Sequence, residues 1–178
     1  EILLKKILNN NYKKKIKIII FDKKGLFGYG NTHNIKLPNS ILLNRIAHQI
    51  SLGSYPFIRF PKELKKYDYN FMEWLKRNKI NHIKKESWPP RSIFAKALRD
   101  KFFELINIIE KKDNIDIELV FDEVANIRKF KNNFIIKTLK KDIFCTHFLL
   151  CSGNYHTSAI NSTLSRSLNK ITKNTDCI

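Results

Sequence analysis

The pattern of apolar and polar positions opens with a clear strand. Residues 15–22 read KIKIIIFD, a β-branched run that becomes fully apolar toward its end. Such a run is typical of a buried parallel strand. Apolar residues spaced as in the last turns of an amphipathic helix precede it over 1–8, and a loop with Gly25, Gly28 and Gly30 follows it. We therefore expect a helix, a parallel strand and a glycine loop at the start of the chain.

Helical periodicity dominates the middle of the sequence. One helix is predicted to end near Lys79, with Asp68 as its cap. A longer helix is predicted from Ser92, acting as its cap, to about Lys111, because its apolar residues fall on one face. Prolines interrupt the region before these helices, where we expect short strands or turns and a helical stretch over 41–50.

The last third of the sequence has the pattern of short strands. Three candidates are predicted to form an antiparallel meander: 115–121, 123–130 and 134–139. A fourth strand is continuous and apolar over 143–151 and ends at Ser152 and Gly153, with His147 expected in its core. We predict one domain over 1–156 and a polar, disordered tail over 157–178.

Composition places the chain among globular proteins. Its 178 residues and 43% hydrophobic content suffice for one core. No apolar run reaches the roughly 18 residues of a membrane span, and no signal-peptide pattern is visible. The three cysteines have no paired spacing, so we expect no disulfide framework and a cytoplasmic location. The five histidines lack metal-ligand spacing, and we predict no metal site.

The formal net charge of +18 taken alone suggests an anionic partner. The lysines, however, are spread along the chain together with isoleucine and asparagine, as in a protein encoded by AT-rich DNA. We therefore do not expect nucleic acid as the partner. A small basic nucleic-acid-binding module remains the alternative, with Trp74 and Trp88 and neighbouring aromatic residues as its stacking surface; helical spacing favours a core position for these residues.

Three sequence features have the chemistry of a nucleotide site. Asp22 ends the first strand, and a carboxylate in that position can accept hydrogen bonds from both hydroxyls of an adenosine ribose. The alternative is a solvated aspartate. The glycine loop can let the backbone approach a ligand or can be a plain turn. The strand end at Ser152 and Gly153 can let the backbone pass close to a cofactor, or is simply a strand followed by a turn.

The ordered set of these stretches resembles the FAD/NAD(P)-binding, Rossmann-type flavoprotein oxidoreductases, in a bacterial subgroup with an insert after the second strand. The stretches are IIIFDKKGLFGYG, ILLNRIAHQISL, NFMEWL, WPPRSIFAKAL and FLLCSGNYH. The resemblance covers residues 16–156. It implies an α/β fold: a partial Rossmann-like FAD/NAD(P)-binding domain with an antiparallel β-meander and a helical insert.

The resemblance also implies a cofactor and its contacts. FAD is the expected cofactor, with NAD(P) as a second nucleotide. Asp22 would hold the FAD ribose, and the backbone around Val124 would lie near the adenine. Arg91 would lie close to the flavin or its phosphates. The remaining expected cofactor contacts are in the loop and at the last strand end: Gly25, Gly28, Gly30, Ser152 and Gly153.

The sequence departs from that family in ways that limit the prediction. No G-x-G-x-x-G turn is present; its expected position falls at or before Glu1, and the C-terminal part of such a protein is also missing. We expect a fragment that holds the adenosine part of FAD weakly or not at all, or a non-functional truncated remnant. Whether the chain is an enzyme stays open, and neither a catalytic residue nor a small-molecule substrate is assigned.

Overall fold

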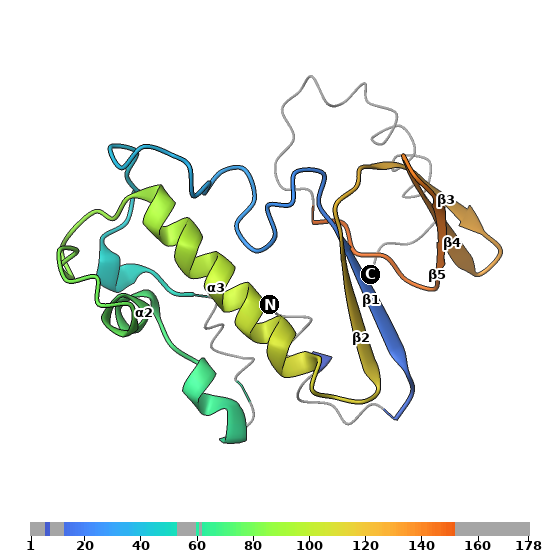
Figure 1. The fold of residues 1–178 in the computed structure, drawn as a ribbon, viewed down its shortest axis with the longest axis horizontal. Coiled ribbons are helices and arrows are strands. Elements are labelled where there is room, and N and C mark those ends of the chain that lie inside the picture. Colours follow the sequence, from blue (N-terminus) through green and yellow to red (C-terminus); the bar gives the residue numbers. More distant parts are fainter. Residues whose placement is uncertain (1–5, 8–12, 53–59, 61, 152–178) are drawn as a thin grey trace. The chain divides into compact units, whose positions relative to one another are not determined.

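The computed structural model describes residues 6–7, 13–52, 60 and 62–151. The chain divides into two units (Figure 1). The helical unit comprises Glu1–Ile20 and Leu26–Glu118, and the meander unit comprises Phe21–Gly25 and Leu119–Ile178. Lys6 and Ile7 are helical, as predicted. The rest of the predicted first helix and the predicted tail lie outside the described residues.

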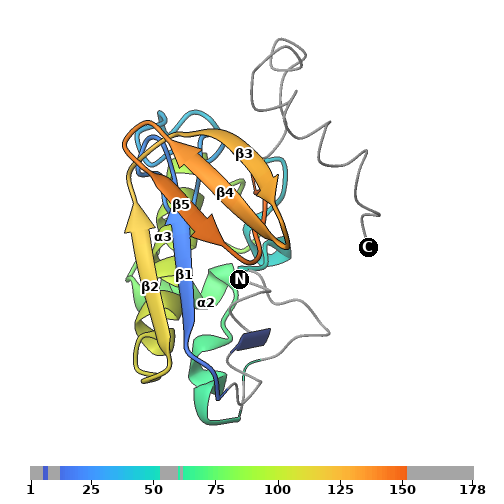
Figure 2. The same cartoon turned by 90° about the vertical axis from the view of Figure 1, so that its right-hand side faces the viewer.

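Two strands form a parallel pair. They are β1, Ile16–Phe21, and β2, Ile115–Val120, and their arrows point the same way in Figure 2. The predicted first strand is confirmed, although its side chains are half-buried rather than buried. The strand predicted over 115–121 is present as β2, but it pairs with β1, so its assignment to the antiparallel meander is wrong. A β-branched run looks alike in either setting, and only pairing between distant residues decides its partner.

The helical unit is built around one apolar core. Its elements are η1, Ala47–Gln49; η2, Lys62–Tyr67; α2, Phe71–Arg77; and α3, Arg91–Ile109. The Phe71 ring is fully buried, stacked on Trp74 at 5.9 Å and edge-on to Phe94 at 5.8 Å between centroids. The two predicted helices are therefore confirmed, and Phe71 and Trp74 lie in the core as predicted. Trp88 is 53% exposed, so the prediction of a core position is wrong for that residue.

The helix caps differ from the prediction. α2 begins with a capping box, in which Asn70 accepts from the Glu73 amide and Glu73 accepts from the Asn70 amide. Asp68 is therefore not the cap. Ser92 lies inside α3, and its hydroxyl donates to the Asn39 side chain at 2.9 Å instead of capping the helix. Side chains that can cap a helix also bond to other partners, so the cap type predicts a boundary only to within a few residues.

Residues 41–50 are irregular apart from η1, so the predicted helical stretch is wrong outside Ala47–Gln49. Their backbone bonds to the segment before α3: the Leu43 amide donates to the Pro89 carbonyl at 2.9 Å, and the Ala47 amide donates to the Ser87 carbonyl at 2.9 Å. These long-range bonds satisfy the groups that a helix would otherwise satisfy internally. Hydrogen bonds to residues 87–89 therefore outweigh the weak helix preference of residues 41–50.

The meander unit contains three antiparallel strands. They are β3, Val124–Phe130; β4, Asn133–Thr138; and β5, Asp142–Cys145. Ile127, Ile135 and Ile136 are its buried hydrophobic residues among those described. The predicted fourth strand is confirmed only as the short β5. After Cys145 the described chain has no regular structure, and His147 is exposed, so the prediction of a core histidine is wrong.

Candidate functional site

Asp22 lies directly after β1, at the carboxyl end of the parallel pair. Its amide donates to the Val120 carbonyl of β2 at 3.1 Å. Its carboxylate Oδ1 accepts from the Lys24 amide at 2.8 Å, and its carbonyl accepts from the Gly25 amide at 3.3 Å. The side chain therefore shapes the turn in which it stands, as an aspartate commonly does. This is the position that the sequence predicted for Asp22.

Gly25 closes that turn in the left-handed region, with φ of 67°. A Cβ on Gly25 would lie 3.1 Å from the Phe121 ring. Glycine is thus favoured twice, by the backbone conformation and by the close approach of an aromatic side chain. Phe121 itself is 61% exposed and lies just after β2. The two strand ends of the parallel pair therefore meet at an apolar surface.

Asp122 is the acidic residue that follows β2, and it is buried, with 6% of its surface exposed. Its Oδ1 accepts from the Glu123 amide at 2.8 Å. Its Oδ2 is buried and has no hydrogen-bond partner among the described residues. The Thr138 hydroxyl first, and then the Glu123 amide and Lys140, lower the pKa of the Asp122 carboxyl, while burial acts in the opposite direction. The carboxylate is therefore held in its ionised form.

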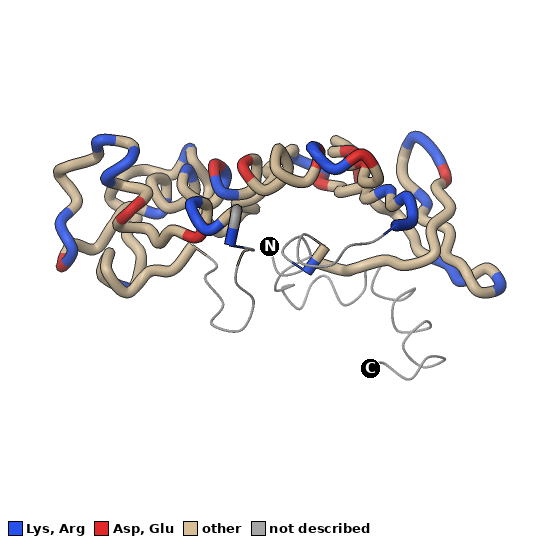
Figure 3. Tube along the Cα trace, turned by 90° about the horizontal axis from the view of Figure 1, so that it is seen from below, with Lys and Arg blue, Asp and Glu red and all other residues tan. Residues whose placement is uncertain are grey.

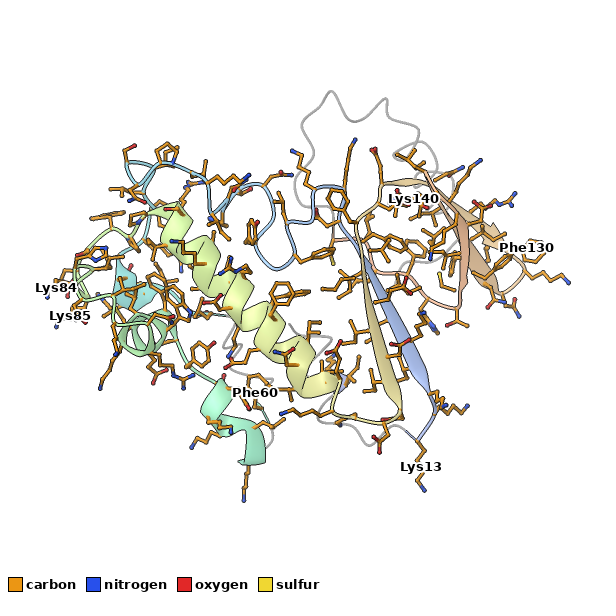
Figure 4. All side chains as sticks on the ribbon, viewed as in Figure 1. Lys13, Phe60, Lys84, Lys85, Phe130 and Lys140 are labelled. Carbon is orange, nitrogen blue, oxygen red and sulfur yellow. The ribbon has the colours of Figure 1, made fainter. Side chains whose placement is uncertain are left out.

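Lysines surround these strand ends. Lys23 forms an ion pair with Glu123 at 2.6 Å, and Lys140 donates to the Phe121 carbonyl at 3.4 Å. Lys140 is labelled in Figure 4. Lys and Arg, blue in Figure 3, are spread along both units, so the strand ends hold only a small part of the chain's positive charge.

Val124 begins β3 beside these strand ends. It pairs with Thr138 of β4, and the register shifts before Asn126 pairs with Lys137. A bulge of this kind leaves one backbone unit out of the ladder and is common next to binding sites. The meander unit therefore brings together Asp22, Gly25 and Val124 of the predicted residues.

The other predicted residues lie in the helical unit. Gly28 has φ of 88°, and a Cβ there would lie 2.6 Å from the Phe102 Cβ, so helix packing requires glycine. Gly30 also has a positive φ, of 65°, but no atom lies within 4 Å of its would-be Cβ. Arg91 begins α3, and its Nε donates to the Leu42 carbonyl at 3.2 Å. Their role in cofactor binding stays a prediction, and Ser152 and Gly153 lie outside the described residues.

Asp122 was missed by the sequence analysis. A signal for it exists, because a Phe-Asp pair stands at both strand ends: Phe21-Asp22 at the end of β1, and Phe121-Asp122 directly after β2. The repeat marks two neighbouring parallel strands that end at one edge. It was missed because the second strand had been assigned to the meander.

The described part of the chain contains neither a metal-binding cluster nor a membrane-spanning helix. No three His, Cys, Asp or Glu side chains there lie close enough together to hold a metal ion. No helix within 6–7, 13–52, 60 and 62–151 combines the length and apolar character needed to cross a bilayer.

Comparison with known proteins bears on the identity of the chain. The model of the FAD-NAD(P)-binding family matches residues 2–155, which include the parallel pair, the helical segment and the whole meander. A search of curated proteins gave no match. The chain therefore belongs to the FAD-NAD(P)-binding family, and its architecture is that of a Rossmann-like α/β domain with an antiparallel meander and a helical insert.

Proposed function

We propose that the meander unit holds the adenosine part of FAD at the carboxyl ends of β1 and β2, as part of a flavin-dependent oxidoreductase. The observation that carries the proposal is the position of Asp22. It directly follows β1, and the chain that leaves the parallel neighbour β2 at Val120 continues into the bulged start of β3 at Val124. Ligands of open α/β sheets bind outside the carboxyl ends of the strands. Membership of the FAD-NAD(P)-binding family supports a nucleotide as the ligand.

The residues at these strand ends fit an adenosine. A carboxylate has two oxygens with about four lone-pair sites, so Asp22 can accept from the Lys24 amide and from ribose hydroxyls as well. The orphaned Oδ2 of Asp122 lies in the segment next to Phe121 and is a second buried acceptor. Phe121 offers an exposed apolar ring, which suits a purine. The bulge at Val124 provides backbone groups outside the ladder.

Asp22 also predicts which nucleotide is preferred. A carboxylate accepts from a free 2′-hydroxyl but repels a 2′-phosphate. FAD, ADP and NAD should therefore bind better than NADP. When bound, the flavin supplies the redox chemistry, and the protein contributes binding, orientation and electrostatics.

The experiment is a titration of the full chain with ADP, followed by calorimetry or by NMR. The expected binding is weak, with a Kd of roughly 1 mM. Asp22→Ala should weaken binding at least tenfold, because a hydrogen bond to a charged group contributes about 1.5–3 kcal/mol. Asp113→Ala is the matched control, since Asp113 is exposed in the turn before β2. Equal loss in both variants, or an unchanged Kd in Asp22→Ala, would refute the proposal.

A further inference from the structure

One face of the meander combines charged, polar and aromatic side chains from all three strands. Side chains two residues apart on a strand share a face. The register places Asn126 beside Lys137, and Lys137 beside Asp142. The next row across the strands contains Arg128, Ile135 and Phe144, and Phe130 follows Arg128 on the same face. We call this set the outer face.

The outer face contains a shallow hollow of about 160 Å³. The buried Ile135 is one of its lining residues, and the others are polar: Asn126, Arg128, Lys137 and Asp142. The Oδ1 of Asn126 is buried and has no hydrogen-bond partner among the described residues. A buried amide oxygen without a partner costs about 1–3 kcal/mol. A ligand that brings an N–H donor would recover that cost.

An aromatic pair lies beside the hollow. The rings of Phe130 and Phe144 pack edge to face, with centroids 6.3 Å apart. Phe130 is 48% exposed and Phe144 is 68% exposed, so this pair is largely accessible. Phe130, labelled in Figure 4, lies at the end of β3 where the hairpin turns. Lys131 follows in that turn, with its Nζ 5.8 Å from the centroid of the Phe130 ring.

The charges of the outer face favour an anionic ligand. Arg128 and Lys137 line the hollow against one acidic residue, Asp142. Lys131 adds positive charge next to the aromatic pair. The chain as a whole carries a net charge of +18, which draws polyanions to it. A ligand for this face therefore needs negative charge, N–H donors and a flat apolar ring.

We propose that the outer face binds single-stranded nucleic acid, with a base against Phe130 and Phe144 and phosphates beside Arg128 and Lys137. Exposed aromatic side chains within a basic surface are the general means of binding single strands. The hollow is too small to enclose a whole dinucleotide, since pockets for drug-sized ligands measure about 300–1,000 Å³. A strand lying over the face needs only a base edge to reach the Asn126 amide. This site is separate from the adenosine site and does not rest on it.

Two other anionic partners fit the observations less well. A membrane of anionic lipids meets cations and exposed phenylalanines, but its headgroups present no flat ring to the pair of Phe130 and Phe144. An acidic peptide supplies backbone donors and carboxylates, but it has no need of a stacked aromatic pair. The base therefore accounts for the features that these partners leave unexplained.

The experiment measures binding of a fluorescein-labelled single-stranded 20-mer to the full chain by anisotropy, at several salt concentrations. Phe130→Ala/Phe144→Ala should weaken binding at least fivefold, the lower limit expected for one stacked base. Arg128→Ala/Lys137→Ala should reduce the slope of log K against log salt by about 1.4, since each phosphate contact on a single strand contributes about 0.7. Circular dichroism verifies that each variant is folded.

Two matched controls test the location. Lys129→Ala removes a lysine from the opposite face of β3, and Lys84→Ala/Lys85→Ala removes two exposed lysines of the helical unit, both labelled in Figure 4. Both should leave the Kd within about twofold. A loss in the helical-unit control equal to that in Arg128→Ala/Lys137→Ala would overturn the proposal, because the attraction would then be general.

Two further ligands test the chemistry. An oligonucleotide of abasic sites keeps the phosphates and lacks the bases, so the Phe130→Ala/Phe144→Ala variant should bind it as well as the unaltered chain does. A fivefold loss on that ligand too would overturn base stacking. Vesicles containing phosphatidylserine should not displace the 20-mer, and displacement would favour a membrane instead. Excess ADP should leave the binding unchanged, which separates this test from that of the adenosine site.

Discussion

The two units of the chain differ in the share of their large apolar residues that is buried. In the helical unit, large side chains such as Phe71, Trp74 and Leu75 are at most 3% exposed. Among the described residues of the helical unit, four large apolar side chains are exposed: Ile41, Leu42, Trp88 and Phe103. Among the described residues of the meander unit, six are exposed, namely Phe121, Phe130, Leu139, Phe144, Leu149 and Leu150, and only Ile127, Ile135 and Ile136 are buried. Exposed apolar side chains gathered in this way commonly mark a binding surface.

The buried polar groups do not separate the two units. In the helical unit, the buried Lys101 donates to the Tyr67 carbonyl and lies 3.9 Å from the centroid of the Tyr69 ring, so its charge is used within the unit. Buried polar atoms without a partner among the described residues occur in both units: on His33 and Glu104 in the helical unit, and on Asp122 and Asn126 in the meander unit. The helical unit is a packed scaffold because most of its large apolar side chains are buried, and the contrast between the units rests on these apolar residues.

The largest expected effect compares one substitution in both units. Phe71→Ala should destabilise the chain by about 3–5 kcal/mol, because it removes a fully buried ring. Phe144→Ala should change stability by no more than about 0.5 kcal/mol, because that ring is 68% exposed. Urea unfolding followed by circular dichroism measures both. Similar losses in the free energy of unfolding for the two variants would contradict the contrast between the units.

Two glycines of one loop sharpen the description of the scaffold. Gly28→Ala should cost about 2–4 kcal/mol, since a methyl group there combines a positive φ with overlap against Phe102. Gly30→Ala should cost only about 1–2 kcal/mol, from the positive φ alone. Thermal melts of the two variants test this order. If Gly30→Ala lowered the melting temperature more than Gly28→Ala, the space around the Gly30 Cβ position could not be open, and the description would be contradicted.

The buried lysine gives a third test of the scaffold. Lys101→Ala should cost about 2 kcal/mol, because it leaves the Tyr67 carbonyl without its donor and removes the cation from the Tyr69 ring. Lys96→Ala is the control on the same helix, since Lys96 is exposed, and should have almost no effect. Indistinguishable melting temperatures for the two variants would mean that Lys101 contributes no net stability.

The smallest effect concerns pH and the meander unit. The folded state lowers the pKa of Asp122, so this carboxylate stabilises the fold above the ordinary carboxyl pKa of 3.8, and that contribution is lost as pH falls through the folded value. Asp122→Asn should therefore make stability less dependent on pH below about pH 5. Melts of both proteins between about pH 5 and pH 3 measure the difference. Parallel curves would contradict the assigned pKa shift.

Local patterns predicted much of the fold. The β-branched run of β1 and the one-sided periodicity of α3 depend on neighbouring residues, and both predictions are confirmed. The partner of β2 and the irregular form of residues 41–50 depend on pairing with distant segments, which no local window contains. Those two predictions were wrong for that reason.

The candidate site was predictable only in part. Asp22 was found because a strand end has a recognisable sequence, and Val124 because of the family resemblance. Asp122 and its neighbour Thr138 were not found, because the site requires β2 to lie beside β1. The unpartnered oxygen of Asn126 depends on packing, which the order of residues does not reveal.

The most direct test of the account is to map where ADP binds. Amide chemical shifts of the isotope-labelled chain would be followed by NMR during an ADP titration, a method suited to weak binding. The account predicts that the largest shift changes fall on Asp22 to Gly25 and Phe121 to Val124. Changes confined to Asn126, Arg128 and Phe130 on the outer face, or no change at saturating ADP, would contradict it.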